Sequence, residues 1–239
     1  MNTAVVNGSI GKTDGLFPIG GSLNDPALSF VELLYEFLSK KGIQAGGWGK
    51  GALKDGRAKL IKTIYSPALG EIIKIMNKKS FNFYAESLLR YSLIKQGKIG
   101  IEENRVEISS FLKNAGVGNF KIVDGSGLSR RNAFSCEGFV KILNYAREKD
   151  YFSSFYDSLI KPGDKAAKGH IKNFGLNKKL DTRIKSGSLN GVRSYVGYIN
   201  DTRGKTYSFC FILNNYVNSS GEIDDFLEDL LFDFIELKK

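Results

Sequence analysis

The chain of 239 residues has little cysteine, histidine and proline. Its two cysteines, Cys136 and Cys210, do not form a Cys-x-x-Cys pair, and His170 is the only histidine. Structural zinc sites use four closely spaced cysteine or histidine ligands, so we expect no zinc site, no other metal and no cofactor. Two free buried thiols are the favoured state of the cysteines. A disulfide between them stays open, and so does the redox compartment.

The sequence also lacks a membrane-spanning segment, because no stretch of about 18 apolar residues occurs. Residues 1–8 contain no basic region followed by an apolar core, which argues against a signal peptide. Two interpretations follow and stay open. The protein is cytoplasmic, or this chain starts downstream of its natural beginning.

The net charge of +10 shows a shortage of acidic residues, with 35 lysines and arginines against 25 aspartates and glutamates. Such an excess suits nucleic acid or an anionic envelope surface. The lysines are scattered without a run of five basic residues, which favours a lysine-rich surface and nothing more. No aromatic–basic motif of the RNA-binding type occurs, so we expect no nucleic-acid partner.

The first two thirds of the chain predict mostly helices after a glycine-rich start at residues 1–27. Asn24-Asp25-Pro26 predicts a helix start and Gly42 its end. Ser66 as N-cap and Pro67 in the first turn predict a helix to Lys78, followed by a bend at Ser80 and a second helix. The remaining expectations are helices near 103–114 and 136–148 and short strands at 59–65 and 120–123.

The last third predicts an antiparallel sheet. Residues 182–188, 193–200 and 205–214 have strand character, and Asp201-Thr202-Arg203-Gly204 joins the last two into a hairpin. An apolar stripe then predicts a final helix, with acids at its start and lysines at its end. The expected fold class is therefore α+β, an antiparallel sheet with helices packed on it.

Three short motifs carry the candidate chemistry, and their order matters more than any one of them. The first is Ser80-Phe81-Asn82, which alone fits a helix cap. The second is Asp124-Gly125-Ser126-Gly127-Leu128-Ser129, which alone fits a tight glycine turn. The third is Lys185-Ser186-Gly187-Ser188, which alone fits the end of a strand.

Together the motifs resemble the serine acyl-enzyme family of penicillin-binding proteins and β-lactamases, whose motifs are Ser-x-x-Lys, Ser-x-Asn and Lys-Thr/Ser-Gly. Residues 77–90 and 124–129 resemble its D-Ala-D-Ala carboxypeptidase/endopeptidase subfamily, which carries a large insertion. Residues 24–27, 42–43 and 66–69 also fit that subfamily. Phe81 departs from the usual Asp, and Ser186 replaces Thr but keeps the hydroxyl. The resemblance implies a β-lactamase/transpeptidase-like sheet with a helical subdomain, incomplete at its N-terminus.

The resemblance implies a role for each motif residue. Ser80 would relay protons, Asn82 would bind the substrate amide, and Lys185 would place a positive charge near the terminal carboxylate of the substrate. Ser186 would bind that carboxylate, and the N–H of Ser188, beside Gly187, would donate to the oxyanion. Asp124 and Ser126 would shape the wall of the site.

The nucleophile motif is the missing part. The four Ser-x-x-Lys strings are no more than chance gives in a chain rich in serine and lysine, and only Ser9–Lys12 precedes Ser80. Glycines flank that string and no apolar run follows it, which argues against the required buried helix. We therefore expect a chain that lacks the nucleophile and is inactive alone.

Two functions stay open. One is a serine-type carboxypeptidase/endopeptidase of peptidoglycan stem peptides ending in D-Ala-D-Ala, which would bind β-lactams once the full site is assembled. The other is an inactive pseudoenzyme that binds the same peptides. The resemblance implies a periplasmic or envelope location. The expected organisation is an entry region at 1–65, a mostly helical part at 66–180 and closing strands and helix at 181–239, forming one structural domain.

Overall fold

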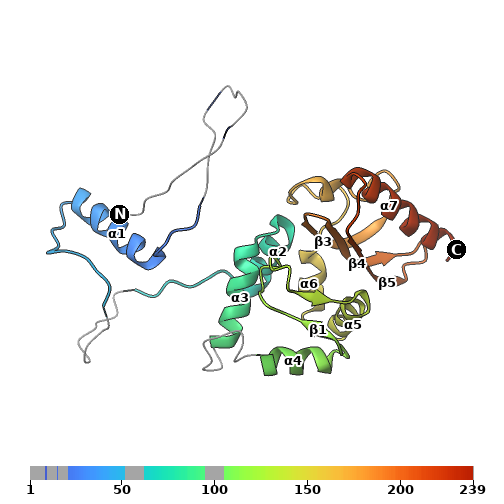
Figure 1. Ribbon diagram of the computed structural model, residues 1–239, viewed down its shortest axis with the longest axis horizontal. Coiled ribbons are helices and arrows are strands. Elements are labelled where there is room, and N and C mark those ends of the chain that lie inside the picture. Colours follow the sequence, from blue (N-terminus) through green and yellow to red (C-terminus); the bar gives the residue numbers. More distant parts are fainter. Residues whose placement is uncertain (1–8, 10–14, 16–20, 52–61, 95–104, 239) are drawn as a thin grey trace. The chain divides into compact units, whose positions relative to one another are not determined.

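The computed structural model describes residues 9, 15, 21–51, 62–94 and 105–238 of the chain (Figure 1). The chain divides into two compact units, Met1–Ile64 and Tyr65–Lys239. Within the described ranges no helix is both long and apolar enough to cross a membrane.

The first unit contains helix α1, Pro26–Lys40. The Asp25 side chain accepts a hydrogen bond from the Leu28 N–H at 2.9 Å and so caps a helix that has Pro26 in its first turn. This start is the predicted one. The apolar stripe of the helix is exposed to solvent, and its large members are Phe30, Leu33, Leu34 and Phe37.

The second unit is built around an antiparallel sheet of three strands: β3 (Asp181–Leu189), β4 (Val192–Asn200) and β5 (Thr206–Asn214). A two-residue turn at Asn190–Gly191 joins the first pair, and Lys185 lies opposite Val196. Side chains alternate between the two faces of the sheet, so each face can bury its own set. These three strands agree with the predicted ones to within one or two residues.

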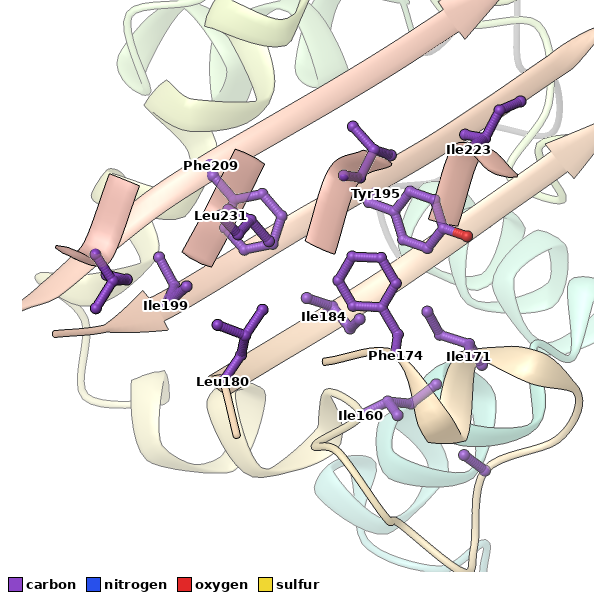
Figure 2. Packing of buried hydrophobic residues seen from close by; sticks show 13 residues of the cluster. Ile160, Ile171, Phe174, Leu180, Ile184, Tyr195, Ile199, Phe209, Ile223 and Leu231 are labelled. Atoms are coloured by element: carbon purple, nitrogen blue, oxygen red, sulfur yellow. The ribbon is translucent and has the colours of Figure 1, made fainter. Parts of the chain in front are cut away.

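Helix α7, Ser220–Glu236, packs on one face of the sheet and closes the main core (Figure 2). Ser219 and Glu222 form a capping box at its start, which satisfies two N–H groups that would otherwise lack partners. Four members of the predicted stripe are buried, namely Ile223, Leu227, Leu231 and Ile235, whereas Phe226 and Leu230 are exposed. Phe174 stacks on Tyr195 inside this core at a centroid distance of 4.7 Å.

Helices α5 (Cys136–Arg147) and α6 (Phe152–Ser158) cover the opposite face. Tyr198 is fully buried there between Leu143 and Leu159, and its hydroxyl donates to the Leu143 carbonyl at 2.8 Å. Sequence periodicity predicts α5 but not α6, which is only seven residues long.

The remaining elements precede or connect these layers. They are α2 (Leu69–Lys79), α3 (Asn82–Ile94), α4 (Arg105–Asn114), the two-residue strands β1 (Phe120–Lys121) and β2 (Ala133–Phe134), and the 3-10 helix η1 (His170–Asn173). Strands β1 and β2 pair with each other beside α4, around the buried side chains Leu112 and Val117.

Two local predictions are wrong. Helix α2 begins at Leu69, three residues after the predicted cap Ser66, and its N-cap Ala68 makes no side-chain hydrogen bond. The same pattern of a polar residue followed by proline does start α1 at Asp25-Pro26, so the proline alone does not fix where a helix begins. Residues 62–65 are not in a strand, and the rest of the predicted strand, residues 59–61, lies outside the described residues.

Candidate active site

The Ser80-Phe81-Asn82 motif forms the turn between α2 and α3. Ser80 ends α2 in the left-handed conformation, with φ 50° and ψ 50°, and Asn82 begins α3. The Phe81 N–H donates to the Met76 carbonyl at 3.1 Å and closes the end of α2. The turn presents all three motif side chains to solvent. The predicted bend at Ser80 is therefore present.

Two buried polar contacts fix the last turn of α2. The Asn77 side chain donates to the Ser158 hydroxyl of α6 at 2.7 Å. Lys78 forms an ion pair with Asp164 at 2.6 Å, and their side chains are only 14% and 8% exposed. Burial would raise the pKa of Asp164, but hydrogen bonds from Lys78 and the Ala166 N–H outweigh it and hold the pKa below its ordinary value. The position of Ser80, two residues after Lys78, is thereby set.

Strand β3 brings Lys185 to this turn. The Lys185 ammonium donates to the Ser80 hydroxyl at 2.6 Å and to the Ser186 carbonyl at 2.6 Å. The two residues of the first contact lie 105 positions apart in the sequence. Desolvation lowers the pKa of the half-buried Lys185. The first and third motifs thus meet through a charge-assisted hydrogen bond.

Beyond Lys185, every second residue of β3 directs its backbone N–H and C=O groups away from β4. Ile184 exchanges both of its backbone hydrogen bonds with Ile160, on the side away from β4. Because backbone groups alternate along an antiparallel strand, the N–H and C=O groups of Ser186 and Ser188 point to the same outer edge. Gly187 lies opposite Ser194, whose Oγ would be only 2.7 Å from a Cβ at this position. A glycine therefore fits the middle of this edge.

The second motif forms a compact loop around the Asp124 carboxylate. One carboxylate oxygen accepts from the Gly127 N–H and the Asn132 side chain, and the other accepts from the Ser126 hydroxyl and the Ser129 N–H, all between 2.7 and 3.1 Å. Burial opposes these hydrogen bonds, which together lower the pKa of Asp124. The structure therefore shows a carboxylate that holds a loop in shape.

Two contacts attach this loop to its surroundings. The Gly125 N–H donates to Glu86 of α3 at 2.7 Å, and Arg130 donates to the Asn190 carbonyl at 3.0 Å. A Cβ at position 125 would be 2.8 Å from the Leu89 Cβ, so the close approach to α3 requires glycine. The loop thus joins the helix that begins at Asn82 to the turn that follows Ser188.

The structure unites some of the predicted site residues more closely than others. Ser80 and Lys185 are in direct contact, and Ser186, Gly187 and Ser188 continue along the same strand. Asn82 lies two residues from Ser80 at the start of α3. Asp124 and Ser126 bind each other in the loop joined to α3. Among the described residues, no cluster of three or more acidic, histidine or cysteine side chains could hold a metal ion.

Sequence reasoning missed the residues that hold the site in place, notably Lys78, Asp164, Ser158 and Glu86. Each lies outside the three motifs, and its partner is far away in the sequence. The one available signal is adjacency, because Asn77 and Lys78 directly precede the first motif.

The Ser-x-x-Lys strings are found in different settings. Ser158 is fully buried and bonded to Asn77 and to the Phe155 carbonyl, so it does not face the turn at Ser80 as a free nucleophile. Ser110 is exposed on α4. Ser9 is exposed in the first unit. Lys12 and Lys95, the lysines of the strings that begin at Ser9 and Ser92, lie outside the described residues.

Comparisons with known proteins agree with this arrangement. The D-Ala-D-Ala carboxypeptidase 3 (S13) family matches residues 1–228. The D-alanyl-D-alanine carboxypeptidase DacB of Haemophilus influenzae is 26% identical over 230 residues, which are 93% of this chain and 47% of that protein. The chain thus spans about half the length of this curated relative.

Solved structures show the same fold. Penicillin-binding protein 4 of Haemophilus influenzae, in complex with a β-lactam, aligns with a TM-score of 0.73 and 25% identity over 85% of this chain and 50% of that one. A class A β-lactamase of Bacteroides cellulosilyticus aligns with a TM-score of 0.50 and 18% identity over 69% and 64%. The β-lactamase/transpeptidase-like fold class predicted from the sequence is therefore confirmed. Because the family match extends over almost the entire sequence, the chain belongs to the D-Ala-D-Ala carboxypeptidase 3 (S13) family.

Proposed function

We propose that this chain supplies one half of a serine-type D-Ala-D-Ala carboxypeptidase/endopeptidase site that acts on peptidoglycan stem peptides in the periplasm or cell envelope. One observation carries the proposal: the 2.6 Å contact between the Lys185 ammonium and the Ser80 hydroxyl. It unites the two motifs that the family resemblance assigns to proton transfer and to carboxylate binding. Membership of the S13 family supports the same assignment.

The outer edge of β3 is suited to binding the end of a peptide. Lys185 offers a cation, the Ser186 hydroxyl offers a hydrogen bond, and backbone groups of Ser186 and Ser188 face the same open edge. A terminal carboxylate at this edge would gain charge-assisted hydrogen bonds. The Ser188 N–H would then face the carbonyl of the bond to be cleaved, where negative charge develops.

The turn at Ser80 is suited to proton transfer. The ammonium of Lys185 lowers the cost of negative charge on the Ser80 oxygen, so this hydroxyl can pass a proton toward the leaving amine. Asn82, two residues later at the start of α3, would bind the substrate amide. The buried contacts of Asn77 and Lys78 hold the end of α2 in place, so Ser80 keeps its position while the substrate binds and reacts.

The attacking serine and its lysine are proposed to come from outside this half-site. Ser158 is buried and bonded to Asn77, which removes the one Ser-x-x-Lys serine that contacts α2 in the described part of the chain. The related penicillin-binding protein 4 is known in complex with a β-lactam. We expect β-lactams to react here as well, once the nucleophile is supplied.

Peptide binding tests the half-site without requiring turnover. The affinities of an acetylated peptide ending in D-Ala-D-Ala and of the same peptide with a terminal amide are measured by calorimetry. A hydrogen-bonded charge pair contributes about 1.5–3 kcal/mol, so the acid is expected to bind roughly 10- to 100-fold more tightly than the amide. Lys185→Met should remove most of this preference, whereas Lys179→Met, on an exposed turn, should keep it.

Equal affinity for acid and amide would overturn the assignment of Lys185. Covalent labelling provides the second arm: the chain is incubated with a labelled penicillin and any labelled serine is mapped by mass spectrometry. We expect no stoichiometric label, because the nucleophile is proposed to come from outside this half-site. A labelled serine within this chain would contradict the half-site. If the complete native protein also binds the peptide but neither hydrolyses it nor reacts with penicillin, the pseudoenzyme is the correct function.

A further inference from the structure

The two cysteines lie against each other across the interface between α5 and β5. Both are free thiols and both are partly exposed, and burial together with the nearby Cys136 side chain raises the pKa of the Cys210 thiol. Cys136 is the first residue of α5, and Cys210 is in the middle of β5. The sequence offers no sign of this pairing, because 73 residues separate them.

The contact belongs to a regular alignment of α5 along β5. At the other end of the helix, Arg147 donates to the Thr206 carbonyl at 3.3 Å, and Ser208 donates to the Asn144 side chain at 2.8 Å. Cys136, Asn144 and Arg147 share one helix face, and Thr206, Ser208 and Cys210 share one strand face. The two cysteines lie on these same two faces, further along the antiparallel pair of elements.

The start of α5 is held firmly at this place. Ser135 caps the helix by accepting from the Gly138 N–H at 3.0 Å, and a Cβ at position 138 would be 2.7 Å from the Phe134 ring. Strand β2, which ends at Phe134, pairs with β1 just before the Asp124 loop. A bond at Cys136 would thus tie this loop, through β2 and α5, to the sheet.

We propose that Cys136 and Cys210 form an intramolecular disulfide when a low-molecular-weight disulfide is available as oxidant. Cys136 attacks first, because burial raises the pKa of the Cys210 thiol and so disfavours its thiolate. The thiolate displaces one thiol of the oxidant and forms a mixed disulfide. Cys210, once deprotonated, attacks the sulfur of Cys136 and releases the second thiol. Two electrons pass to the oxidant, whose two sulfurs leave with the two protons.

The experiment treats the folded chain with oxidised glutathione and then alkylates any remaining thiols without reduction. We expect the wild-type chain to lose both alkylation sites and two hydrogen atoms in mass, and to remain a monomer. A peptide containing both cysteines should appear in a non-reducing digest. The Tm of the oxidised wild-type chain should be roughly 5 °C or more above that of the reduced chain.

The variants Cys136→Ser and Cys210→Ser are the matched controls, since serine is close to cysteine in size. Each should keep one alkylatable thiol, or acquire one glutathione, and should show no such rise in Tm on oxidation. The proposal is wrong if the wild-type chain keeps both thiols, acquires two glutathiones, or forms only disulfide-linked dimers.

Discussion

The ion pair between Lys78 and Asp164 offers the sharpest test of how the Ser80 turn is held. Its side chains are 14% and 8% exposed, and the Asp164 carboxylate also accepts from the Ala166 N–H. The variant Lys78→Met removes the cation but keeps an unbranched apolar chain. The carboxylate would then be buried without its counter-charge, which typically costs about 3–5 kcal/mol.

The matched control is Lys79→Met, one residue further along α2. Lys79 has no side-chain partner in the part of the chain that the structure describes, so its replacement should change the free energy of unfolding by less than about 0.5 kcal/mol. At about 2–4 °C per kcal/mol, Lys78→Met should lower the Tm by roughly 6 °C or more. Thermal unfolding followed by circular dichroism measures both.

A double variant separates lost charge from lost packing. Lys78→Met with Asp164→Leu removes both charges, and apolar replacement of a buried pair is often neutral, so it should recover much of the loss. Acid gives an independent check. The pKa of Asp164 lies below its ordinary value of 3.8, so its contribution is complete above pH 3.8 and is lost as the pH falls through the lower pKa. If Lys78→Met and Lys79→Met have the same Tm, the ion pair does not hold the turn.

Two further predictions concern the sheet beneath the site. Gly197→Ala should destabilise the fold by at least about 3 kcal/mol, because a Cβ would lie 1.9 Å from the Arg183 carbonyl oxygen. The control is Gly118→Ala, where a Cβ meets nothing within 4 Å, and its free energy of unfolding should change by less than about 0.5 kcal/mol. Equal urea midpoints for the two variants would refute this. Arg193→Met should cost about 3 kcal/mol, because the buried guanidinium binds both oxygens of Asp224 on α7; an unchanged urea midpoint would contradict it.

The sequence is most informative where local chemistry decides the structure. The apolar stripe of α7, the alternation in β3 to β5 and the Asp25-Pro26 helix start are each visible in a short window, and each is present. Helix α2 shows the limit of such rules. Aspartate followed by proline starts α1, yet serine followed by proline does not start α2, which begins at Leu69, so the local pattern alone does not decide the start.

The site was predictable only in part, because its contacts join distant segments. Resemblance to a family indicates that Ser80 and Lys185 belong to one site, whereas spacing alone does not bring two residues 105 positions apart together. The supporting contacts of Lys78 with Asp164 and of Cys136 with Cys210 have no local signal. They depend on how α2, α5 and α6 pack, which is a property of the assembled core.

The charge state of Lys185 depends directly on its burial at the site. Desolvation holds its pKa below the ordinary value of 10.5, so the unfolded chain binds more protons than the folded one just below that pH. The free energy of unfolding should therefore rise as the pH increases through the interval between the two pKa values. A carboxylate bound beside the ammonium would favour the charged form and raise the pKa again.

The most direct test of the half-site is an NMR titration of the Lys185 ε-methylene group, assigned by comparison with Lys185→Met. We expect the Lys185 pKa to lie below 10.5 in the free protein, to increase on adding acetylated D-Ala-D-Ala, and not to increase with the terminal amide of the same peptide. A Lys185 that titrates at its ordinary value and responds equally to both peptides would contradict its role in binding the terminal carboxylate.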